Sequence, residues 1–299
     1  MGHLNRAYAI GCALKETHGI TPLVLTTSSF LPQAITGALP IVRWSTGGFA
    51  DTSPWNHLLR DQIKSWIESL SLDALVADTF AHGPENELLG LSLPRWVIQR
   101  EGQSPESTRH FLVNPQGVGY VLNTPPAQQA SRLHAQRYWG VDPNGAPLLV
   151  VAHNGDTLET RSFFEWVLGH LQGAPYQVRL ASLLPCLKPE WTPIWRCDYP
   201  LARWYAGVDL LLGGGGYNLV TEARCYGLRR YLCAFERPVD RQWERIQSEP
   251  HFYWGISSAD FLACIERLLA ADAPAALPSD QIQGAEQIAQ VLAESLSKS

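Results

Sequence analysis

A run of four glycines, Gly213–Gly216, constrains this chain more than any other feature of its sequence. The apolar run Val208-Asp-Leu-Leu-Leu212 precedes it, and Tyr217-Asn-Leu-Val-Thr-Glu222 follows it. This order predicts a strand, a glycine loop and a short helix that ends at Gly227. Glycine has no Cβ, so a ligand can approach the backbone N–H groups of the loop closely. The first turn of a helix attracts anions, so we expect an anion here, and a diphosphate fits best.

The glycine run does not match the two best-known phosphate-binding motifs. Asn218 or Leu219 stands where the last glycine of G-x-G-x-x-G belongs, and no Gly-Lys-Ser/Thr follows as in a P-loop. The alternative interpretation is therefore a tight turn between a strand and a helix, without a ligand.

Length and composition predict a globular protein of two domains. The 299 residues exceed a typical single domain, and 45% of them are hydrophobic. The net charge is −5 and no cluster of Lys and Arg is present, which argues against nucleic acid as a partner. Only 17% of the residues are charged, which leaves contact with a membrane surface open. No apolar run is long enough to span a bilayer, so we expect no transmembrane segment.

Cysteine and acid spacings give no indication of a metal site. The six cysteines form no C-x-x-C pair, and no Asp-x-Asp triplet occurs. The start of the chain does not read as a secretory signal, and free cysteines suit a reducing compartment. We therefore expect no metal and a cytoplasmic location.

Strands alternate with helices along the chain, which predicts parallel sheets with helices on both faces. In the first half, the expected helices are 3–17, 55–70 and 85–91, and the expected strands are 23–27, 41–44, 74–78, 95–98, 111–113 and 119–122. In the second half, the expected helices are 127–137, 157–171, 257–269 and 280–296, and the expected strands are 147–152, 177–181, 194–197, 208–212 and 230–235.

Asn123-Thr-Pro-Pro126 interrupts this alternation, so we place the domain boundary there. The expected domains are residues 1–125 and 126–279, followed by a final helix within 280–299. Two α/β domains in series predict a cleft between them, with ligands bound beyond the carboxyl ends of the strands.

Several motifs occur in the order found in GT-B glycosyltransferases. Gly2-His-Leu-Asn-Arg6 resembles the G-x-G-H-x-x-R motif at the start of their first helix, and Asp78-Thr-Phe-Ala-His-Gly83 resembles a strand end of their acceptor domain. Val208–Glu222 and Arg237-Pro-Val-Asp-Arg-Gln242 resemble the donor domain of bacterial nucleotide-sugar transferases. Those enzymes are related to the one that adds N-acetylglucosamine to the peptidoglycan lipid precursor. The resemblance covers most of the chain. It implies an α/β fold of two Rossmann-like domains facing across a cleft, with the last helix returning to the first domain.

The resemblance also implies the donor-binding residues. The backbone of Gly214, Gly215, Gly216, Tyr217 and Asn218 would hold the donor diphosphate. Glu222 would accept hydrogen bonds from both ribose hydroxyls. Gln242, helped by Asp240, would bind the donor sugar. The alternatives are a solvated helix carboxylate for Glu222 and the polar start of a helix for Gln242.

The catalytic residues follow from the same resemblance. His3 would be the base that removes the proton of the acceptor hydroxyl. Asp78 would orient His3 or contact the acceptor. Arg6 lies one turn beyond His3 and would bind a phosphate or pair with an acid. The alternatives are a capping or packing role for His3 and a structural role for Asp78.

Three features depart from the family pattern. The relatives have a strand before the G-x-G-H turn, whereas only Met1 stands there in this sequence, so we expect that the natural protein starts upstream. His153-Asn-Gly-Asp156 replaces a turn that is often rich in glycine. Arg241 replaces an acid that usually precedes the glutamine, which leaves the identity of the donor sugar open.

The motifs together predict an inverting glycosyltransferase. It would move a sugar from a nucleotide diphosphate donor, with UDP expected, to a hydroxyl acceptor. It would use no metal and no bound cofactor, because the helix end and the glycine loop would stabilise the leaving diphosphate. A nucleotide-sugar hydrolase or epimerase on the same scaffold is one alternative, and a catalytically silent nucleotide-sugar-binding protein is another.

Overall fold

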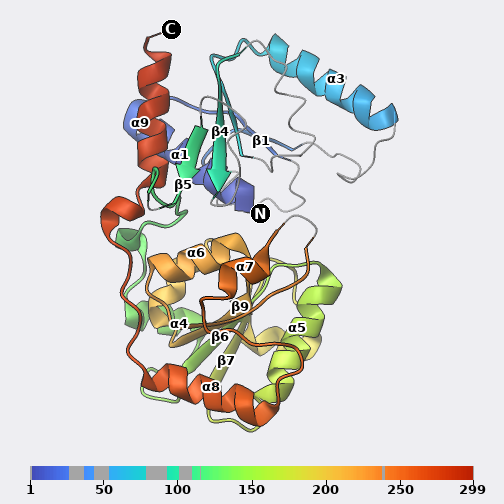
Figure 1. Cartoon of the computed structure of the whole chain (residues 1–299), viewed down its shortest axis with the longest axis vertical. Coiled ribbons are helices and arrows are strands. Elements are labelled where there is room, and N and C mark those ends of the chain that lie inside the picture. Colours follow the sequence, from blue (N-terminus) through green and yellow to red (C-terminus); the bar gives the residue numbers. More distant parts are fainter. Residues whose placement is uncertain are drawn as a thin grey trace. The chain divides into compact units, whose positions relative to one another are not determined.

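The computed structural model describes residues 2–26, 37–43, 54–78, 93–100, 110–114, 116–237 and 240–298. The chain divides into two compact units, Met1–Asn123 with Pro278–Ser299, and Thr124–Leu277 (Figure 1). The sequence analysis placed the breaks after residues 125 and 279. Among the described residues, no helix is both long enough and apolar enough to cross a membrane.

Five parallel strands form the sheet of the Thr124–Leu277 unit. They are β6 (Leu148–Ala152), β7 (Gln177–Ala181), β8 (Trp195–Arg196), β9 (Leu210–Gly214) and β10 (Arg230–Cys233). Their order across the sheet is β8-β7-β6-β9-β10, so the direction in which the chain builds the sheet reverses between β6 and β9. Ligands of such sheets bind beyond the carboxyl ends of the strands at this reversal, which is called the switch point.

Helices cover both faces of this sheet because both faces are apolar (Figure 1). They are α4 (Arg132–Trp139), α5 (Thr157–His170), α6 (Tyr217–Cys225), α7 (Gln242–Ile246) and α8 (Ser258–Ala270), together with the 3-10 turns η2 (Pro126–Gln128), η3 (Pro189–Ile194) and η4 (Leu201–Gly207). Every residue of β6 is buried. Leu149 and Val151 pack in one cluster with α5 and α8, and Leu148 and Val150 pack in another with α4, η4 and α6. The prediction of helices on both faces of a parallel sheet is confirmed for this unit.

The α6 helix begins without a side-chain cap, as α7 does. Side chains cap the N-termini of α4, α5 and α8, where Ser131, Asp156 and Ser257 accept hydrogen bonds from backbone N–H groups. The N-cap residue of α6 is Gly216, which has no side chain. Gly227 ends α6 with a φ of +65°, and its N–H donates to the carbonyl of Arg224.

The other unit contains α1 (Gly2–His18), α3 (Pro54–Ser69) and α9 (Gly284–Leu296), with the turn η5 (Ser279–Gln281) before α9. Its described strands form two separate parallel sheets, one of β1 (Val24–Thr26) and β2 (Ile41–Arg43), the other of β3 (Leu75–Ala77), β4 (Arg95–Arg100) and β5 (His110–Val113). The α9 helix packs along α1, so the end of the chain returns to the unit in which it began (Figure 1).

Three sequence-based predictions of secondary structure are wrong. Gly119–Leu122 is not a strand, because the backbone of Tyr120 bonds instead to Gln281 and Gly284 around η5 and the start of α9. The helix expected at 127–137 is the separate elements η2 and α4. The loop expected from Gly213 begins two residues later, because β9 includes Gly213 and Gly214. The helix expected at 85–91 lies outside the described residues.

We expect Gly227→Ala to destabilise the protein more than Gly173→Ala. Both glycines have a positive φ, of +65° and +77°. An added Cβ at Gly227 would lie 2.7 Å from the backbone N of Ala276, whereas nothing lies within 4 Å of a Cβ at Gly173. Backbone strain should cost both variants about 1–2 kcal/mol, and overpacking should add about 1–3 kcal/mol to Gly227→Ala. Urea unfolding measures both losses, and equal losses would contradict this account of how α6 ends.

Candidate functional site

The four glycines of the run differ in what surrounds them. At Gly213, Gly214 and Gly215, an added Cβ would come too close to another part of the same unit. The side chains that it would meet belong to Leu219, His153 and Ile246, respectively. At Gly216, nothing described lies within 4 Å of the added Cβ. Packing therefore explains the first three glycines, and Gly216 leaves open space at the start of α6.

Hydrogen bonds within the protein show which backbone groups of the predicted diphosphate site are already occupied. The N–H of Gly215 donates to the backbone of β10 (2.7 Å), and its carbonyl accepts from Nη1 of Arg245 (2.6 Å). The N–H of Val220 donates to the carbonyl of Gly216 (3.1 Å), which closes the first turn of α6. Anions at helix N-termini meet the N–H groups that precede this first internal bond. The part of the predicted site with open space beside the helix end is therefore Gly216, at the start of α6.

One cation is fixed beside this helix end. Arg245 of α7 bonds to Gly215, its Nη2 lies 2.5 Å from Oδ1 of Asp240, and its guanidinium lies 5.5 Å from the ring centre of Tyr217. The ion pair and the carbonyl together hold the guanidinium in one place. No sequence motif points to Arg245, and only its spacing of three from Gln242 could have placed it on the same face of α7.

Gln242 is buried, and its amide holds other parts of the site together. Its Oε1 accepts from the backbone N–H of Phe235 (3.0 Å), and its Nε2 donates to Oδ2 of Asp240 (3.2 Å). These bonds connect α7 to the chain after β10 and fix the carboxylate of Asp240. Gln242 therefore holds Asp240 in place, and both polar atoms of its amide bond within the protein.

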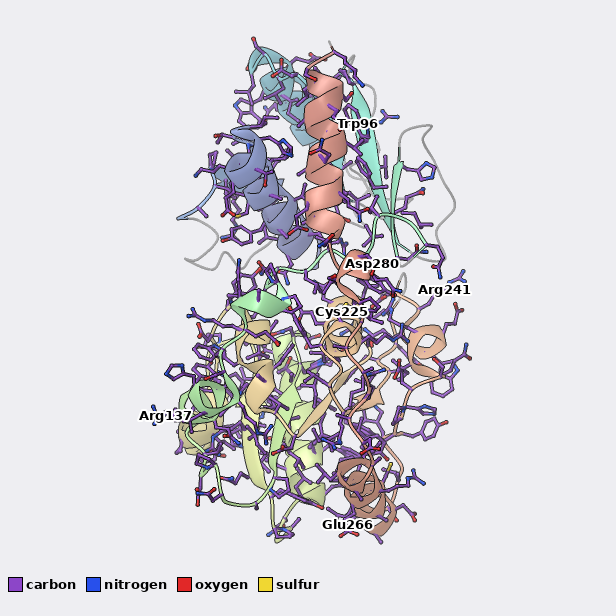
Figure 2. All side chains as sticks on the ribbon, turned by 90° about the vertical axis from the view of Figure 1, so that its left-hand side faces the viewer. Trp96, Arg137, Cys225, Arg241, Glu266 and Asp280 are labelled. Carbon is purple, nitrogen blue, oxygen red and sulfur yellow. The ribbon has the colours of Figure 1, made fainter. Side chains whose placement is uncertain are left out.

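Arg241, the departure from the family pattern, lies apart from this network. Its side chain is 77% exposed and forms an ion pair with Glu244 at 3.4 Å. Figure 2 shows it at the edge of its unit. Because a solvated pair of this kind contributes little to stability, the arginine leaves the arrangement of Gln242 and Asp240 unaffected.

Glu222 lies one turn into α6, beside Tyr205 of η4. The Tyr205 hydroxyl donates to Oε2 of Glu222 (3.2 Å), and Oε1 makes no hydrogen bond within the described part of the chain. Burial raises the pKa of Glu222 to about 7, and the bond from Tyr205 opposes this rise only in part. A carboxylate that titrates near neutrality and keeps one oxygen for a ligand suits a partner that donates hydrogen bonds, such as a ribose.

Arg6 and Asp78 form a buried ion pair in the first unit. Nε of Arg6 lies 2.7 Å from Oδ2 of Asp78, and Nη2 lies 2.9 Å from Oδ1. The side chains are only 2% and 7% exposed. Arg6 was expected either to bind a phosphate or to pair with an acid, and in the structure it pairs with Asp78. His3 lies in the first turn of α1, and its side chain is outside the described residues.

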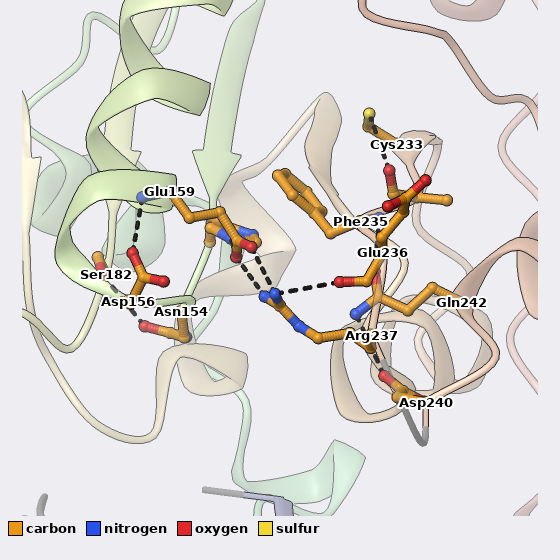
Figure 3. A network of polar contacts seen from close by, with 12 residues as sticks. Asn154, Asp156, Glu159, Ser182, Cys233, Phe235, Glu236, Arg237, Asp240 and Gln242 are labelled. Atoms are coloured by element: carbon orange, nitrogen blue, oxygen red, sulfur yellow. Dashed lines mark hydrogen bonds and ion pairs between the residues drawn. The ribbon is translucent and has the colours of Figure 1, made fainter.

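The sequence analysis gave no role to a polar network at the carboxyl end of β6. His153 follows that strand, and its Nε2 lies 2.6 Å from Oε1 of Glu159 in α5. Arg237, beyond β10, bonds to both carboxylate oxygens of Glu159 (Figure 3). The sequence feature that could have indicated this network is His153 itself, which stands where a glycine-rich turn was expected. Within the described residues, no group of three or more His, Cys, Asp or Glu could hold a metal ion.

Comparisons with known proteins identify the fold. No protein-family model and no curated protein sequence matches the chain. By contrast, 113 chains of solved structures match, and the following three align over nearly their whole length. The glycotransferase of kitacinnamycin has a TM-score of 0.65 at 12% identity, covering 98% of this chain and 96% of its own. MurG of Acinetobacter baumannii has a TM-score of 0.57 at 12% identity, and the alignment covers 100% of this chain and 96% of MurG. SsfS6 of Streptomyces sp. SF2575, complexed with thymidine diphosphate, has a TM-score of 0.56 at 14% identity. The alignment covers 97% of this chain and 91% of SsfS6.

These structures are glycosyltransferases of the GT-B fold, which has two Rossmann-like domains. The chain therefore has the GT-B fold, and the predicted fold class is confirmed. At 12–14% identity, the likeness establishes the fold alone.

The raised pKa of Glu222 predicts how stability depends on pH. The folded state binds this proton more tightly than the unfolded state, in which a glutamate has a pKa near 4.3. The stabilisation is therefore fully present below about pH 4 and is lost as the pH rises through about 7. Between pH 5 and 8, the wild type should lose on the order of 1–3 kcal/mol relative to Glu222→Gln, because the amide does not titrate.

Urea unfolding at pH 5, 6, 7 and 8 measures this difference. Glu266→Gln is the matched control, because Glu266 is exposed on α8 and its profile should follow the wild type. Identical pH profiles for the wild type and Glu222→Gln would show that Glu222 keeps its charge throughout.

Proposed function

We propose that this protein is a glycosyltransferase that moves a sugar from a nucleoside diphosphate donor to a hydroxyl acceptor. The observation that carries the proposal is the uncapped start of α6, which opens onto free space at the switch point of a GT-B fold. The nucleotide sugar would be a co-substrate and not a bound cofactor. The acceptor would be a molecule whose hydroxyl can reach the anomeric carbon of the donor sugar.

The donor diphosphate would lie against the backbone of Gly216, Tyr217 and Asn218. The absence of a Cβ at Gly216 lets an oxygen approach the helix end, and the positive end of the dipole favours its charge. Arg245, held beside Tyr217, adds a fixed positive charge nearby. As the bond between the sugar and the diphosphate breaks, these groups would stabilise the charge that develops on the leaving group, so that a metal is not needed for that purpose.

Glu222 and Asp240 would bind the rest of the donor. A ribose hydroxyl can donate to Oε1 of Glu222, while Tyr205 holds the other oxygen. Asp240 would contact the donor sugar, positioned by Gln242 and Arg245. A pyrimidine nucleotide is the preferred donor in this proposal, with UDP expected from the sequence and thymidine diphosphate present in one structural neighbour.

His3 would activate the acceptor. Its imidazole would take the proton of the acceptor hydroxyl as the oxygen attacks the anomeric carbon from the side opposite the diphosphate, so the configuration inverts. The new bond joins the acceptor oxygen to the sugar, and the nucleoside diphosphate leaves with the electron pair of the broken bond. Arg6 and Asp78 would hold the first turns of α1 against β3, and so position His3.

Binding of nucleoside diphosphates tests the donor site. We expect UDP or TDP, at 100 times its dissociation constant, to stabilise the protein by about 2.7 kcal/mol and raise Tm by about 5–10 °C, with less effect from GDP. Gly216→Ala should weaken binding on the order of tenfold, because its Cβ faces the space that the diphosphate would occupy. Gly173→Ala is the matched control, and its affinity should stay unchanged. Equal affinity for the wild type and Gly216→Ala would contradict this site.

A sugar-transfer assay tests the reaction. UDP-glucose, UDP-N-acetylglucosamine and TDP-glucose are incubated with a panel of phenolic, lipid and sugar hydroxyl acceptors and, in parallel, without an acceptor. We expect release of the nucleotide to depend on the acceptor, and His3→Ala to lower kcat by about 100-fold with unchanged nucleotide affinity, since it removes only the base. Equal turnover with and without acceptors would indicate a hydrolase and contradict the proposal. An active His3→Ala variant would exclude His3 as the base.

A further inference from the structure

The two oxygens of the Glu222 carboxylate have different surroundings. Oε2 accepts a hydrogen bond of 3.2 Å from the hydroxyl of Tyr205, whose side chain is only 1% exposed. Glu222 itself is partly exposed, so a ligand can reach its carboxylate from outside. Because Tyr205 is fully buried, it meets the carboxylate from the inside of the protein, and Oε1 is the oxygen left for a ligand.

Packing holds Tyr205 where it is. Its ring belongs to a buried apolar cluster that also contains Leu211 of β9 and Ala223 of α6. The 3-10 turn that carries it, η4, lies close against α4, since a Cβ added to Gly207 would be 2.9 Å from the Cβ of Ala135. The tyrosine therefore cannot move aside without disturbing the core between α4, α6 and the sheet.

The Tyr205 hydroxyl also has no substitute for Glu222. The carboxylate is its only hydrogen-bond partner within the described part of the chain. A ligand that displaced the tyrosine from Oε2 would leave a buried hydroxyl without a partner, which is unfavourable. A hydroxyl of a ligand therefore has to use Oε1, while Tyr205 keeps Oε2.

The position of Glu222 along α6 suits the ribose of the proposed donor. Glu222 is six residues beyond Gly216, the N-cap of the helix, which corresponds to about 9 Å along the axis. Glu222 also shares a face of the helix with Asn218, four residues earlier. A nucleotide whose diphosphate lies at the helix start would place its ribose along this stretch of α6.

We propose that Tyr205 is a specificity-determining residue of the donor site, which limits Glu222 to one of the two ribose hydroxyls. A free carboxylate can accept from two adjacent hydroxyls side by side, one on each oxygen. The sequence analysis expected this arrangement for Glu222. With Oε2 occupied by Tyr205, only one such bond remains, so a nucleotide that lacks the other hydroxyl binds as well as the ribonucleotide. This inference rests on the proposed function, because the ribose belongs to its donor.

Deoxynucleotides test how many hydroxyls Glu222 binds. UDP, 2′-deoxy-UDP and 3′-deoxy-UDP are titrated calorimetrically into the wild type at pH 8, where Glu222, with a pKa of about 7, is mostly ionised. We expect one of the two deoxy analogues to bind on the order of tenfold more weakly than UDP, because it loses a hydrogen bond to a charged group. The other analogue should bind within about twofold of UDP.

The Tyr205→Phe variant tests the role of the tyrosine. It keeps the ring but releases the carboxylate, which can then turn both oxygens toward the ribose. The analogue that the wild type binds as well as UDP should now bind about fivefold more weakly than UDP. Tyr226→Phe is the matched control, because the Tyr226 hydroxyl donates to the carbonyl of Thr124 and not to Glu222. It should keep the pattern of the wild type, and a purely structural effect of Tyr205→Phe would lower all three affinities alike.

The outcomes separate this inference from the proposed function. Equal losses for both analogues in the wild type show that Glu222 binds two hydroxyls, which overturns the role of Tyr205 and leaves the donor site intact. Full affinity for both analogues, or a Tyr205→Phe variant with the pattern of the wild type, overturns it as well. Should Tyr205→Phe fail to fold, the three nucleotides and the wild type decide the matter. Failure of UDP and TDP to bind at all overturns both proposals.

Discussion

The close approach of backbone and side chains at the carboxyl end of β9 fixes the position of α6. At Gly213, Gly214 and Gly215, other parts of the unit occupy the volume that a side chain would need. One of these neighbours comes from α6 itself, one from the end of β6 and one from α7. Because each glycine admits a different element, larger residues here would push α6, β6 and α7 away from one another. The start of α6 is therefore rigidly placed above the sheet.

Charge pairing extends this rigidity to the polar groups around α6. Arg237 is held by Glu159, 78 residues earlier in the chain. Arg245 is held by Asp240, just before α7, and by the carbonyl of Gly215. Polar groups that are already oriented need not reorganise when charge develops on a ligand, which is the usual source of electrostatic stabilisation in enzymes. Glu222 differs from these residues because its partner, Tyr205, is neutral. Its carboxylate therefore responds to pH and to a bound donor of hydrogen bonds.

The sequence predicted those parts of the structure that local patterns determine. Apolar runs and helical spacing located most strands and helices, because a parallel sheet covered on both faces needs such runs. Partners distant in sequence were not predictable. Arg6 and Asp78 are 72 residues apart, and Arg237 and Glu159 are 78 apart. Gly119–Leu122 has the composition of a strand, but its backbone bonds to a segment about 160 residues later in the chain.

The glycines of the run Gly213–Gly216 serve two different structural purposes. As a motif, it suggested a diphosphate site on the backbone of Gly214–Asn218. In the structure, β9 includes Gly213 and Gly214, and only Gly216 of the run has free space where its Cβ would be. A glycine needed for packing and a glycine needed for a ligand look the same in a sequence, since both lack a Cβ. What lies opposite each missing Cβ distinguishes them. By that criterion, His153 requires a glycine at position 214, and Gly216 is the glycine of the run that has room for a ligand.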